Sequence, residues 1–302
     1  MTTTAPPIPS DLLRISDLEA SSLTALLDLA AVMKTRPHGF VEALRGDTLV
    51  CFFEKPSTRT RVSFAAAAER LGMFPLLLRP DELQLGRGET IEDTARTLSG
   101  YAQAIVVRTF AQETVERLAE AATAPVINAL TDEHHPCQAL ADLLTLRERF
   151  GRLEGLRVAF VGSGNNVATS LAEAGALTGM HVVVACPRGY EPSAEAAEVV
   201  RDPLEAVAGA DAVYTDVWVS MGEEAERDER LATLEPYRVD ALLMAAARAD
   251  AVFMHCLPAH RGEEVTAEVI DGPQSVVWQQ AENRLPTEEA LLLALVSRRW
   301  ET

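Results

Sequence analysis

The sequence predicts an α/β protein of two domains, each a parallel β-sheet flanked by helices, joined by interdomain helices. The chain has 302 residues, which is enough for two domains of ordinary size. Hydrophobic residues make up 48% of the chain, so a sizeable core can be buried. Short β-rich runs alternate with alanine- and leucine-rich helical runs, and this alternation is typical of βαβ units in parallel sheets.

The first predicted domain opens with a helical stretch and continues as alternating strands and helices. Thr48–Phe53 is a compact apolar run of strand length, and the alanine-rich run Thr58–Gly72 that follows is strongly helical. The other elements expected here are helices at Ser10–Met33, Ile91–Tyr101 and Glu113–Ala122 and strands at Ala104–Val107 and Pro125–Ala129.

A connecting helix follows at Cys137–Phe150. Pro136 lies near its start, a position that proline favours, and Gly151 ends it. We therefore expect the domain boundary near Asp132–Pro136, with a first domain of residues 1–134 and a second of residues 135–285.

The strand and helix pattern restarts in the second domain, with a helix at Val167–Thr178. The strands expected there are Arg157–Val161, His181–Ala185, Ala212–Asp216, Ala251–Cys256 and Ser275–Trp278. Pro286 opens a terminal helix that runs to about Arg298. We expect residues 286–302 to pack back on the first domain.

The acidic composition limits the partners of the chain. Its 45 acidic residues against 27 basic ones give a net charge of −18, which disfavours nucleic-acid binding but allows a local basic pocket for a small anion. No apolar run approaches the ~18–20 residues that span a bilayer, and the N-terminus lacks the pattern of a signal peptide. We expect a cytoplasmic protein with free thiols at its four scattered cysteines.

The turn between the first strand and the next helix has the features of an anion site. Ser57 and Thr58 lie at the expected helix cap, where hydroxyl oxygens can accept from free backbone N–H groups. Arg59 and Arg61 follow in the first turn, where the helix dipole disfavours cations unless an anion is bound. The alternative is a capped helix with a solvated basic turn. The Gly-x-x-x-x-Gly-Lys spacing of a nucleotide-binding loop is absent.

The string Ser-Thr-Arg-Thr-Arg at Ser57–Arg61 resembles the carbamoyl-phosphate signature of the aspartate and ornithine carbamoyltransferase family. Further segments similar to motifs of that family follow in the expected order at His135–Gln138, Asp216–Gly222, His255–Pro258 and Ala281–Arg284. The resemblance runs from about Leu12 to the C-terminus. The Ser-Met-Gly and His-Cys-Leu-Pro segments resemble those of the ornithine-specific members rather than members that use aspartate, putrescine or acetylated ornithine.

The resemblance implies an enzyme that moves the carbamoyl group of carbamoyl phosphate to the δ-amine of L-ornithine, giving L-citrulline and phosphate, a step of arginine biosynthesis. The first domain would bind carbamoyl phosphate and the second ornithine, with neither metal nor cofactor. The residues implied for carbamoyl phosphate are Ser57, Thr58, Arg59, Thr60, Gln84, Arg108, His135, Gln138, Cys256, Leu257 and Arg284. Those implied for ornithine are Asn166, Asp216, Ser220 and Met221, and those implied for catalysis are Arg108, His135, Gln138, Asp216, Cys256 and Arg284.

The resemblance also implies individual roles. Arg108 would contact the phosphate and the carbonyl oxygen, His135 would donate to that oxygen, and Gln138 would accept from the carbamoyl NH2. Arg284 would close on the donor from the second domain. Cys256 would contact the attacking amine without acting as a nucleophile, because direct attack by the amine needs no acyl-enzyme.

Without the resemblance, these residues have simpler interpretations. Arg108 could be a surface arginine at a strand end, Asp216 a turn acid and Cys256 a small buried hydrophobe. His134 competes with His135, which we choose on the motif alone.

Two further expectations concern motion and assembly. Ser220–Arg230 contains five acids, two arginines and one glycine, which indicates exposed, mobile chain. The resemblance implies that this segment closes over ornithine and excludes water. It also implies that Gln84 reaches a neighbouring subunit's site, and hence a homotrimer or a multiple of it with shared active sites.

The sequence gives less support to three other functions. A nicotinamide-dependent dehydrogenase would need a third glycine where Val167 stands after Gly162 and Gly164. A zinc module built on His255, Cys256 and His260 lacks a convincing fourth ligand. A noncatalytic scaffold on the same fold would not need all the site residues that the resemblance implies.

Overall fold

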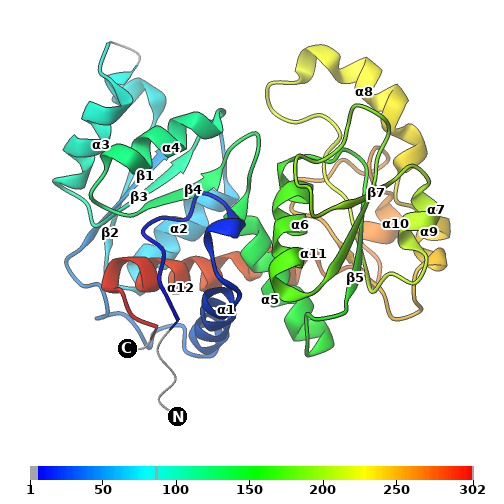
Figure 1. Cartoon of the computed structure of the whole chain (residues 1–302), viewed down its shortest axis with the longest axis horizontal. Coiled ribbons are helices and arrows are strands. Elements are labelled where there is room, and N and C mark those ends of the chain that lie inside the picture. The colour runs from blue at the N-terminus through cyan, green and yellow to red at the C-terminus, as the bar shows by residue number, and fades with distance from the viewer. Residues whose placement is uncertain (1–5, 86–87, 301–302) are drawn as a thin grey trace. The chain divides into compact units, whose positions relative to one another are not determined.

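The computed structural model describes residues 6–85 and 88–300. The chain divides into two compact units. Unit 1 comprises Met1–Leu144 and Asn283–Thr302, and unit 2 comprises Thr145–Glu282. Each unit contains one β-sheet whose paired strands are parallel, with helices around it (Figure 1). The α/β fold of two parallel sheets predicted from the sequence is therefore confirmed.

Unit 1 contains a four-stranded sheet with the order β2-β1-β3-β4. Its strands are β1 (Thr48–Phe53), β2 (Phe74–Leu78), β3 (Ala104–Arg108) and β4 (Val126–Leu130). Its helices are α1 (Ala20–Thr35), α2 (Arg59–Arg70), α3 (Ile91–Ser99), α4 (Gln112–Ala121) and α12 (Arg284–Ser297), with short 3-10 helices η1 (Ile15–Asp17) and η2 (Pro80–Glu82). Helix α5 (Pro136–Phe150) begins in unit 1 and ends in unit 2.

The central strands of unit 1 are apolar because they are covered on both faces. All five residues of β3 are buried, and Ile105 and Val107 pack in one cluster with Val115 and Leu118 of α4. The C-terminal helix α12 packs on α1 and α2, so the two ends of the chain meet in one unit (Figure 1).

Unit 2 contains a five-stranded sheet with the order β7-β6-β5-β8-β9. Its strands are β5 (Arg157–Val161), β6 (His181–Ala185), β7 (Glu198–Val200), β8 (Ala212–Tyr214) and β9 (Val252–Met254). Its helices are α6 (Asn166–Thr178), α7 (Pro203–Val207), α8 (Arg227–Leu234), α9 (Ala241–Ala246), α10 (Ala267–Ile270) and α11 (Val277–Glu282), with 3-10 helices η4 (Glu224–Glu226) and η5 (Glu235–Tyr237).

The order of strands creates one switch point in each sheet. In unit 1 successive strands are added on opposite sides of β1, so β1 and β3 are neighbours whose following loops diverge. In unit 2 the same occurs between β5 and β8. Open parallel sheets bind ligands beyond the carboxyl ends of the strands at such points. The two switch points are therefore where functional residues are expected.

Some local predictions were wrong. Ser275–Trp278 was expected to be a strand, but Ser275 makes only an isolated bridge to Phe253 and the chain enters α11 at Val277. A short apolar run does not distinguish a strand from a buried helical turn. The opening helix begins later than Ser10, because a bridge at Leu12 and the 3-10 helix η1 precede α1.

Two expectations that rest on composition can also be compared with the structure. The four cysteines are free thiols. Among the described residues, no helix is both long enough and apolar enough to cross a bilayer.

Candidate active site

The turn after β1 is fixed against the end of β3. The backbone N–H groups of Glu54 and Lys55 donate to the carbonyl oxygen of Arg108 at 2.8 and 3.5 Å. Arg108 is the last residue of β3 and is 7% exposed. The sheet pairing therefore places this buried arginine beside the turn that leads into α2, at the switch point of unit 1.

Helix α2 begins within the predicted anion-binding string. Ser57 Oγ accepts from the N–H of Thr60 at 3.2 Å, whereas Thr58, the N-cap residue, makes no capping bond with its side chain. Only one of the two expected capping hydroxyls is therefore used in this way. Arg59 is exposed at the first helical position, while Thr60 is buried. Helix dipole and arginine charge thus coincide at this end of α2, which is suited to an anion.

Arg284 lies at the first position of α12 and joins three elements of unit 1. Its Nη1 donates to Gln138 Oε1 on α5 at 3.1 Å, and its Nη2 reaches Thr60 Oγ1 on α2 at 3.4 Å. Its Nε and Nη2 donate to Glu288 Oε1 at 3.0 and 2.6 Å. Gln138 Nε2 in turn donates to Asp142 Oδ1 at 2.8 Å. These bonds fix the orientation of the Gln138 carboxamide, with its oxygen towards Arg284.

This network changes the assignment of three residues to domains. His135 and Gln138 were placed in the second predicted domain because the boundary was set before the connecting helix, and Arg284 was placed there because that domain was extended to residue 285. In the structure they belong to unit 1, which contains α5 as far as Leu144 and the chain from Asn283. The sequence pattern marks where α5 starts but not which unit its first turns pack against.

His135 lies buried among the arginines of unit 1. Burial lowers its pKa well below the ordinary value for histidine, and the charges of Arg284, Arg108 and Arg59 lower it further. The imidazole is therefore neutral at neutral pH. A neutral ring donates through one nitrogen and accepts through the other, so it can polarise a carbonyl oxygen without carrying a charge.

The competing histidine, His134, lies in different surroundings. Its backbone N–H donates to Thr131 Oγ1 at 3.1 Å. Burial lowers its pKa, and the charge that adds to this effect is that of Arg14. His135, and not His134, therefore shares the electrostatic field of the predicted donor-binding arginines.

Gln84 lies on the exposed turn that follows η2. Its carbonyl oxygen accepts from the N–H of Glu89 at 3.2 Å. Within the described residues, no hydrogen bond joins its side chain to the other predicted residues of unit 1. The structure of a single chain therefore does not bring Gln84 together with them.

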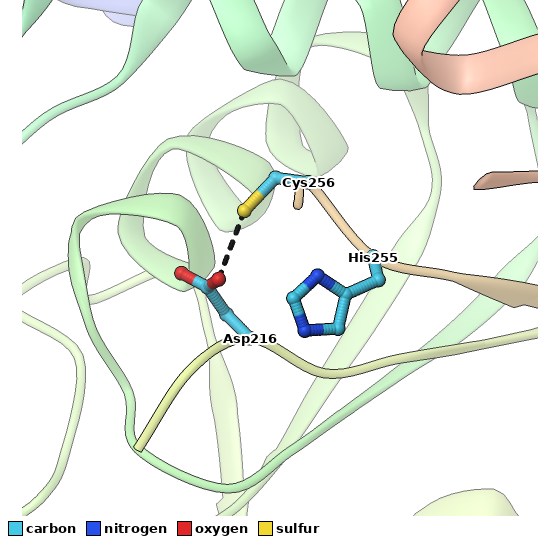
Figure 2. A group of neighbouring side chains, drawn as sticks. All are labelled: Asp216, His255 and Cys256. Carbon is cyan, nitrogen blue, oxygen red and sulfur yellow. Dashed lines mark hydrogen bonds between the residues drawn. The ribbon is translucent and has the colours of Figure 1, made fainter. Parts of the chain in front are cut away.

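In unit 2, Asp216 and Cys256 face each other across the ends of β8 and β9. The Cys256 thiol donates to Asp216 Oδ1 at 2.9 Å, and Figure 2 shows the sulfur directed at the carboxylate. Asp216 is 8% exposed. The contact gives the thiol a role in holding the carboxylate.

The second oxygen of Asp216 is held by a residue that the sequence analysis missed. Asn165 Nδ2 donates to Asp216 Oδ2 at 2.6 Å, while Asn165 Oδ1 accepts from the N–H groups of Val167 and Ala168 at 3.1 and 3.2 Å. Asn165 is thus the N-cap of α6, and the predicted residue Asn166 is the first residue of that helix. The N-cap preference of asparagine was the signal that could have identified it.

The turn at His255–Leu257 is fixed by the histidine ring. The N–H of Leu257 donates to His255 Nδ1 at 2.9 Å, so the proton of the neutral ring lies on Nε2, which is 3.3 Å from Glu264 Oε1. Leu257 has φ of 60°, in the left-handed region that is rare for leucine. Such backbone geometry is concentrated at functional sites.

Metal ligation was also weighed at this turn. Asp216, His255 and Cys256 each offer one ligand atom, and these atoms lie within 4.8 Å of one another (Figure 2). However, His255 already uses both ring nitrogens and the Cys256 thiol donates to Asp216. A metal ion would have to break these contacts, and the zinc set of His255, Cys256 and His260 is not brought together.

The Ser220–Met221–Gly222 loop follows β8. The N–H of Ser220 donates to Glu223 Oε2 at 2.8 Å, and Met221 is 40% exposed. The acidic segment after it, expected to be exposed, mobile chain, forms η4 and the start of α8, and its side chains are mostly exposed.

The glycines after β5 serve the local packing. Gly162 has φ of 128°, and a Cβ on Gly164 would come within 2.4 Å of the nitrogen of Pro192. The chain therefore needs glycine at both positions for its own fold. Their spacing gives no support to a dinucleotide-binding loop.

Comparison with known proteins covers nearly the whole chain. Residues 10–148 match the family model described as the aspartate/ornithine carbamoyltransferase carbamoyl-P binding domain, and residues 154–295 match the Asp/Orn binding domain of that family. An ornithine carbamoyltransferase of Bacillus subtilis is 52% identical over 95% of this chain and 93% of that protein.

Solved structures give the same result. The ornithine carbamoyltransferase of Pyrococcus furiosus is 48% identical with a TM-score of 0.91, over 97% of this chain and 98% of that one. The enzyme of Thermus thermophilus is 46% identical with a TM-score of 0.90, over 96% and 99%.

Proposed function

Because this chain belongs to the aspartate/ornithine carbamoyltransferase family, we propose that it transfers the carbamoyl group of carbamoyl phosphate to the δ-amine of L-ornithine. The nitrogen lone pair attacks the carbonyl carbon, the bond from that carbon to the phosphate oxygen breaks, and L-citrulline and phosphate leave. The attacking nitrogen loses a proton, which the product phosphate can accept. No covalent acyl-enzyme is required.

The observation that carries this proposal is the chemistry of the two switch points. The switch point of unit 1 gathers Arg108, a helix N-terminus and the Arg284 network, which suits a phosphorylated donor. The switch point of unit 2 presents the carboxylate of Asp216, which suits a cationic amino acid. Positive groups for the donor and a negative group for the acceptor match the charges of the two substrates.

We assign the phosphate to the start of α2, with Ser57, Thr58, Arg59 and Thr60 as its ligands. Backbone N–H groups at a helix N-terminus and an arginine fork are both suited to phosphate oxygens. Arg108 contacts the phosphate and the carbonyl oxygen. Both groups gain negative charge in the transition state, so a buried arginine that is already in position stabilises the transition state more than the ground state.

We assign the carbamoyl group to His135, Gln138 and Arg284. The neutral ring of His135 donates to the carbonyl oxygen, and the Gln138 oxygen accepts from the carbamoyl NH2. Because Arg284 and Asp142 fix the Gln138 amide, its oxygen does not have to turn when the donor binds. Cys256 and Leu257 complete the donor contacts that the family resemblance implies.

We assign ornithine to residues that follow β5 and β8. Asp216 binds the side-chain amine, with Cys256 beside the attacking nitrogen. Asn166, Ser220 and Met221 bind the amino-acid end. A free alkylamine has a pKa of roughly 10.4, so the δ-amine must lose a proton before it attacks. The segment Ser220–Arg230 closes over ornithine and excludes water from the reaction.

We propose that the protein acts in the cytoplasm as a homotrimer, or a multiple of it, in arginine biosynthesis. The exposed turn that carries Gln84 is available to reach a neighbouring subunit's site. The four free thiols of the protein are consistent with a reducing compartment. Light scattering on the active enzyme tests the assembly, and a fully active monomer would contradict it.

The function is tested by offering purified protein carbamoyl phosphate together with ornithine, aspartate, putrescine or N-acetylornithine in separate reactions. The carbamoylated product is quantified by mass spectrometry. We expect citrulline to form far faster than the other products. A preference for another acceptor would overturn the ornithine assignment, and transfer to none of the four would overturn the proposed reaction.

A further inference from the structure

Arg230 of α8 occupies the centre of a polar cluster in unit 2. Its side chain is only 12% exposed, although much of the helix faces solvent. Its Nε donates to the carbonyl oxygen of Trp218 at 2.8 Å, and its Nη2 donates to Ser163 Oγ at 3.3 Å. Its guanidinium lies over the ring of Tyr190, 5.1 Å from the centroid. One side chain thus connects α8, the chain after β8 and the turn after β5.

The same guanidinium is also linked to the Ser220–Met221–Gly222 loop through the carboxylate of Glu223. Arg230 Nη2 lies 3.2 Å from Glu223 Oε2, and that oxygen also accepts from the backbone N–H of Ser220 at 2.8 Å. The N–H of Glu223 donates back to the carbonyl oxygen of Ser220 at 3.1 Å. The backbone at Ser220 is therefore tied to Arg230 by two consecutive polar contacts.

We propose that Arg230 is a positioning residue for ornithine recognition. It holds the Ser220–Gly222 loop in a fixed position relative to the switch point between β5 and β8. The inference rests on the proposed function, because it assigns the loop to ornithine. Arg230 reaches the turn on one side of this switch point through Ser163 and the loop on the other side through Trp218 and Glu223. Arg230 acts through these contacts and does not itself need to touch the substrate.

The geometry of these contacts requires an arginine, and another cationic side chain such as lysine would not replace it. The planar guanidinium donates in several directions at once and stacks on the Tyr190 ring, whereas a lysine ammonium is a compact point charge. Lysine at this position would keep an attraction for Glu223 but could not serve Trp218, Ser163 and Tyr190 together. A lysine variant therefore separates the positioning role from the charge alone.

Arg248, which follows α9 in the same unit, provides a matched control. Its side chain is 52% exposed, and it pairs with Asp211 and Asp250 at 3.2 and 3.1 Å rather than with the loop. Removing it takes the same charge from unit 2, but it removes no contact to the Ser220–Gly222 loop or to the turn after β5.

The experiment compares Arg230→Lys, Arg230→Ala and Arg248→Ala with the wild type in citrulline formation, varying each substrate in turn. We expect both Arg230 variants to raise the KM for ornithine about tenfold or more, because one charge-assisted hydrogen bond is worth about that factor. The KM for carbamoyl phosphate should stay within about twofold, since that substrate binds through other residues. Arg248→Ala should leave both constants unchanged.

A merely structural role predicts another pattern, in which Arg230→Lys and Arg230→Ala lose active enzyme while both KM values stay as in the wild type. That result would overturn the inference, as would an equal rise in both constants. If Arg230→Ala does not fold, Arg230→Lys and Glu223→Gln decide the matter, because both keep the side-chain volume nearly constant. Failure of the wild type to form citrulline would instead reject the proposed function.

Discussion

Replacing Asp216 by asparagine removes one negative charge from the proposed ornithine half of the site with almost no change in shape. The carboxylate accepts from Asn165 Nδ2 at 2.6 Å and from the Cys256 thiol at 2.9 Å. These contacts hold the carboxylate in place, but both partners are neutral and do not compensate its charge. An incoming ornithine ammonium supplies that missing cation, so the Asp216→Asn enzyme should bind ornithine weakly.

The magnitude follows from burial. Asp216 is 8% exposed, so its pairing with an amine is screened far less than a surface ion pair. Loss of one partner of a buried, hydrogen-bonded charge pair costs about 2–5 kcal/mol. Asparagine keeps one acceptor, so the lower end, about 2–3 kcal/mol, is the better expectation. At about 1.4 kcal/mol per factor of ten, the KM for ornithine should rise about 30- to 150-fold.

The assay is initial-rate citrulline formation with ornithine varied at saturating carbamoyl phosphate, and the reverse. The KM for carbamoyl phosphate should change by less than about twofold, because all of its proposed ligands except Cys256 and Leu257 lie in unit 1. Asp202→Asn is the matched control, since Asp202 caps α7 by accepting from the N–H of Leu204 and asparagine caps equally well. An Asp216→Asn enzyme with the ornithine KM of the wild type would refute the assignment.

Two further predictions concern pH. Burial raises the pKa of Glu289 to about 7, so stability is greatest below the ordinary pKa and is lost as pH rises through 7. From pH 5 to pH 8, Glu289→Gln should therefore gain about 2.5 kcal/mol relative to the wild type in urea unfolding. His135, with its lowered pKa, stays neutral, so kcat/KM for carbamoyl phosphate should show no histidine inflection between about pH 6 and 8. An inflection that disappears in His135→Gln would contradict this.

The sequence predicted the central strands and the edge strands β4 and β9, but it missed β2 and β7, the opposite edge strand of each sheet. Strands β1, β3 and β5 are buried on both faces and appear as short apolar runs. Strand β2 at one edge contains Pro75 and has Phe74 65% exposed. Strand β7 at the edge of the other sheet is only Glu198–Val200. The proline in β2 argues against a strand, and β7 is too short to give a periodic pattern.

Those residues of the candidate site that lie in recognisable motifs or at the ends of predicted strands could be predicted from the sequence. Strand ends at the switch points follow from the order of apolar runs, and Arg108 and Asp216 stand at or just beyond those ends. Asn165 was missed because an N-cap and the first helical residue are adjacent and, here, identical in type. In the structure, Asn165 is identified as the cap because its Oδ1 accepts from the backbone N–H groups of Val167 and Ala168.

Glu288, the buried partner of the predicted residue Arg284, could not be predicted, because a four-residue spacing does not reveal whether a pair is buried. Arg284 and Glu288 are four residues apart on α12, with side chains 5% and 1% exposed, and their contact is 2.6 Å. Glu226 and Arg230 have the same spacing near α8, but Glu226 is 66% exposed and 3.7 Å away. An exposed pair contributes little to stability, whereas breaking a buried one leaves an uncompensated charge. The same sequence interval therefore describes a surface contact in one helix and an essential support of the candidate site in another, and only the packing of α12 on α1 and α2 decides between them.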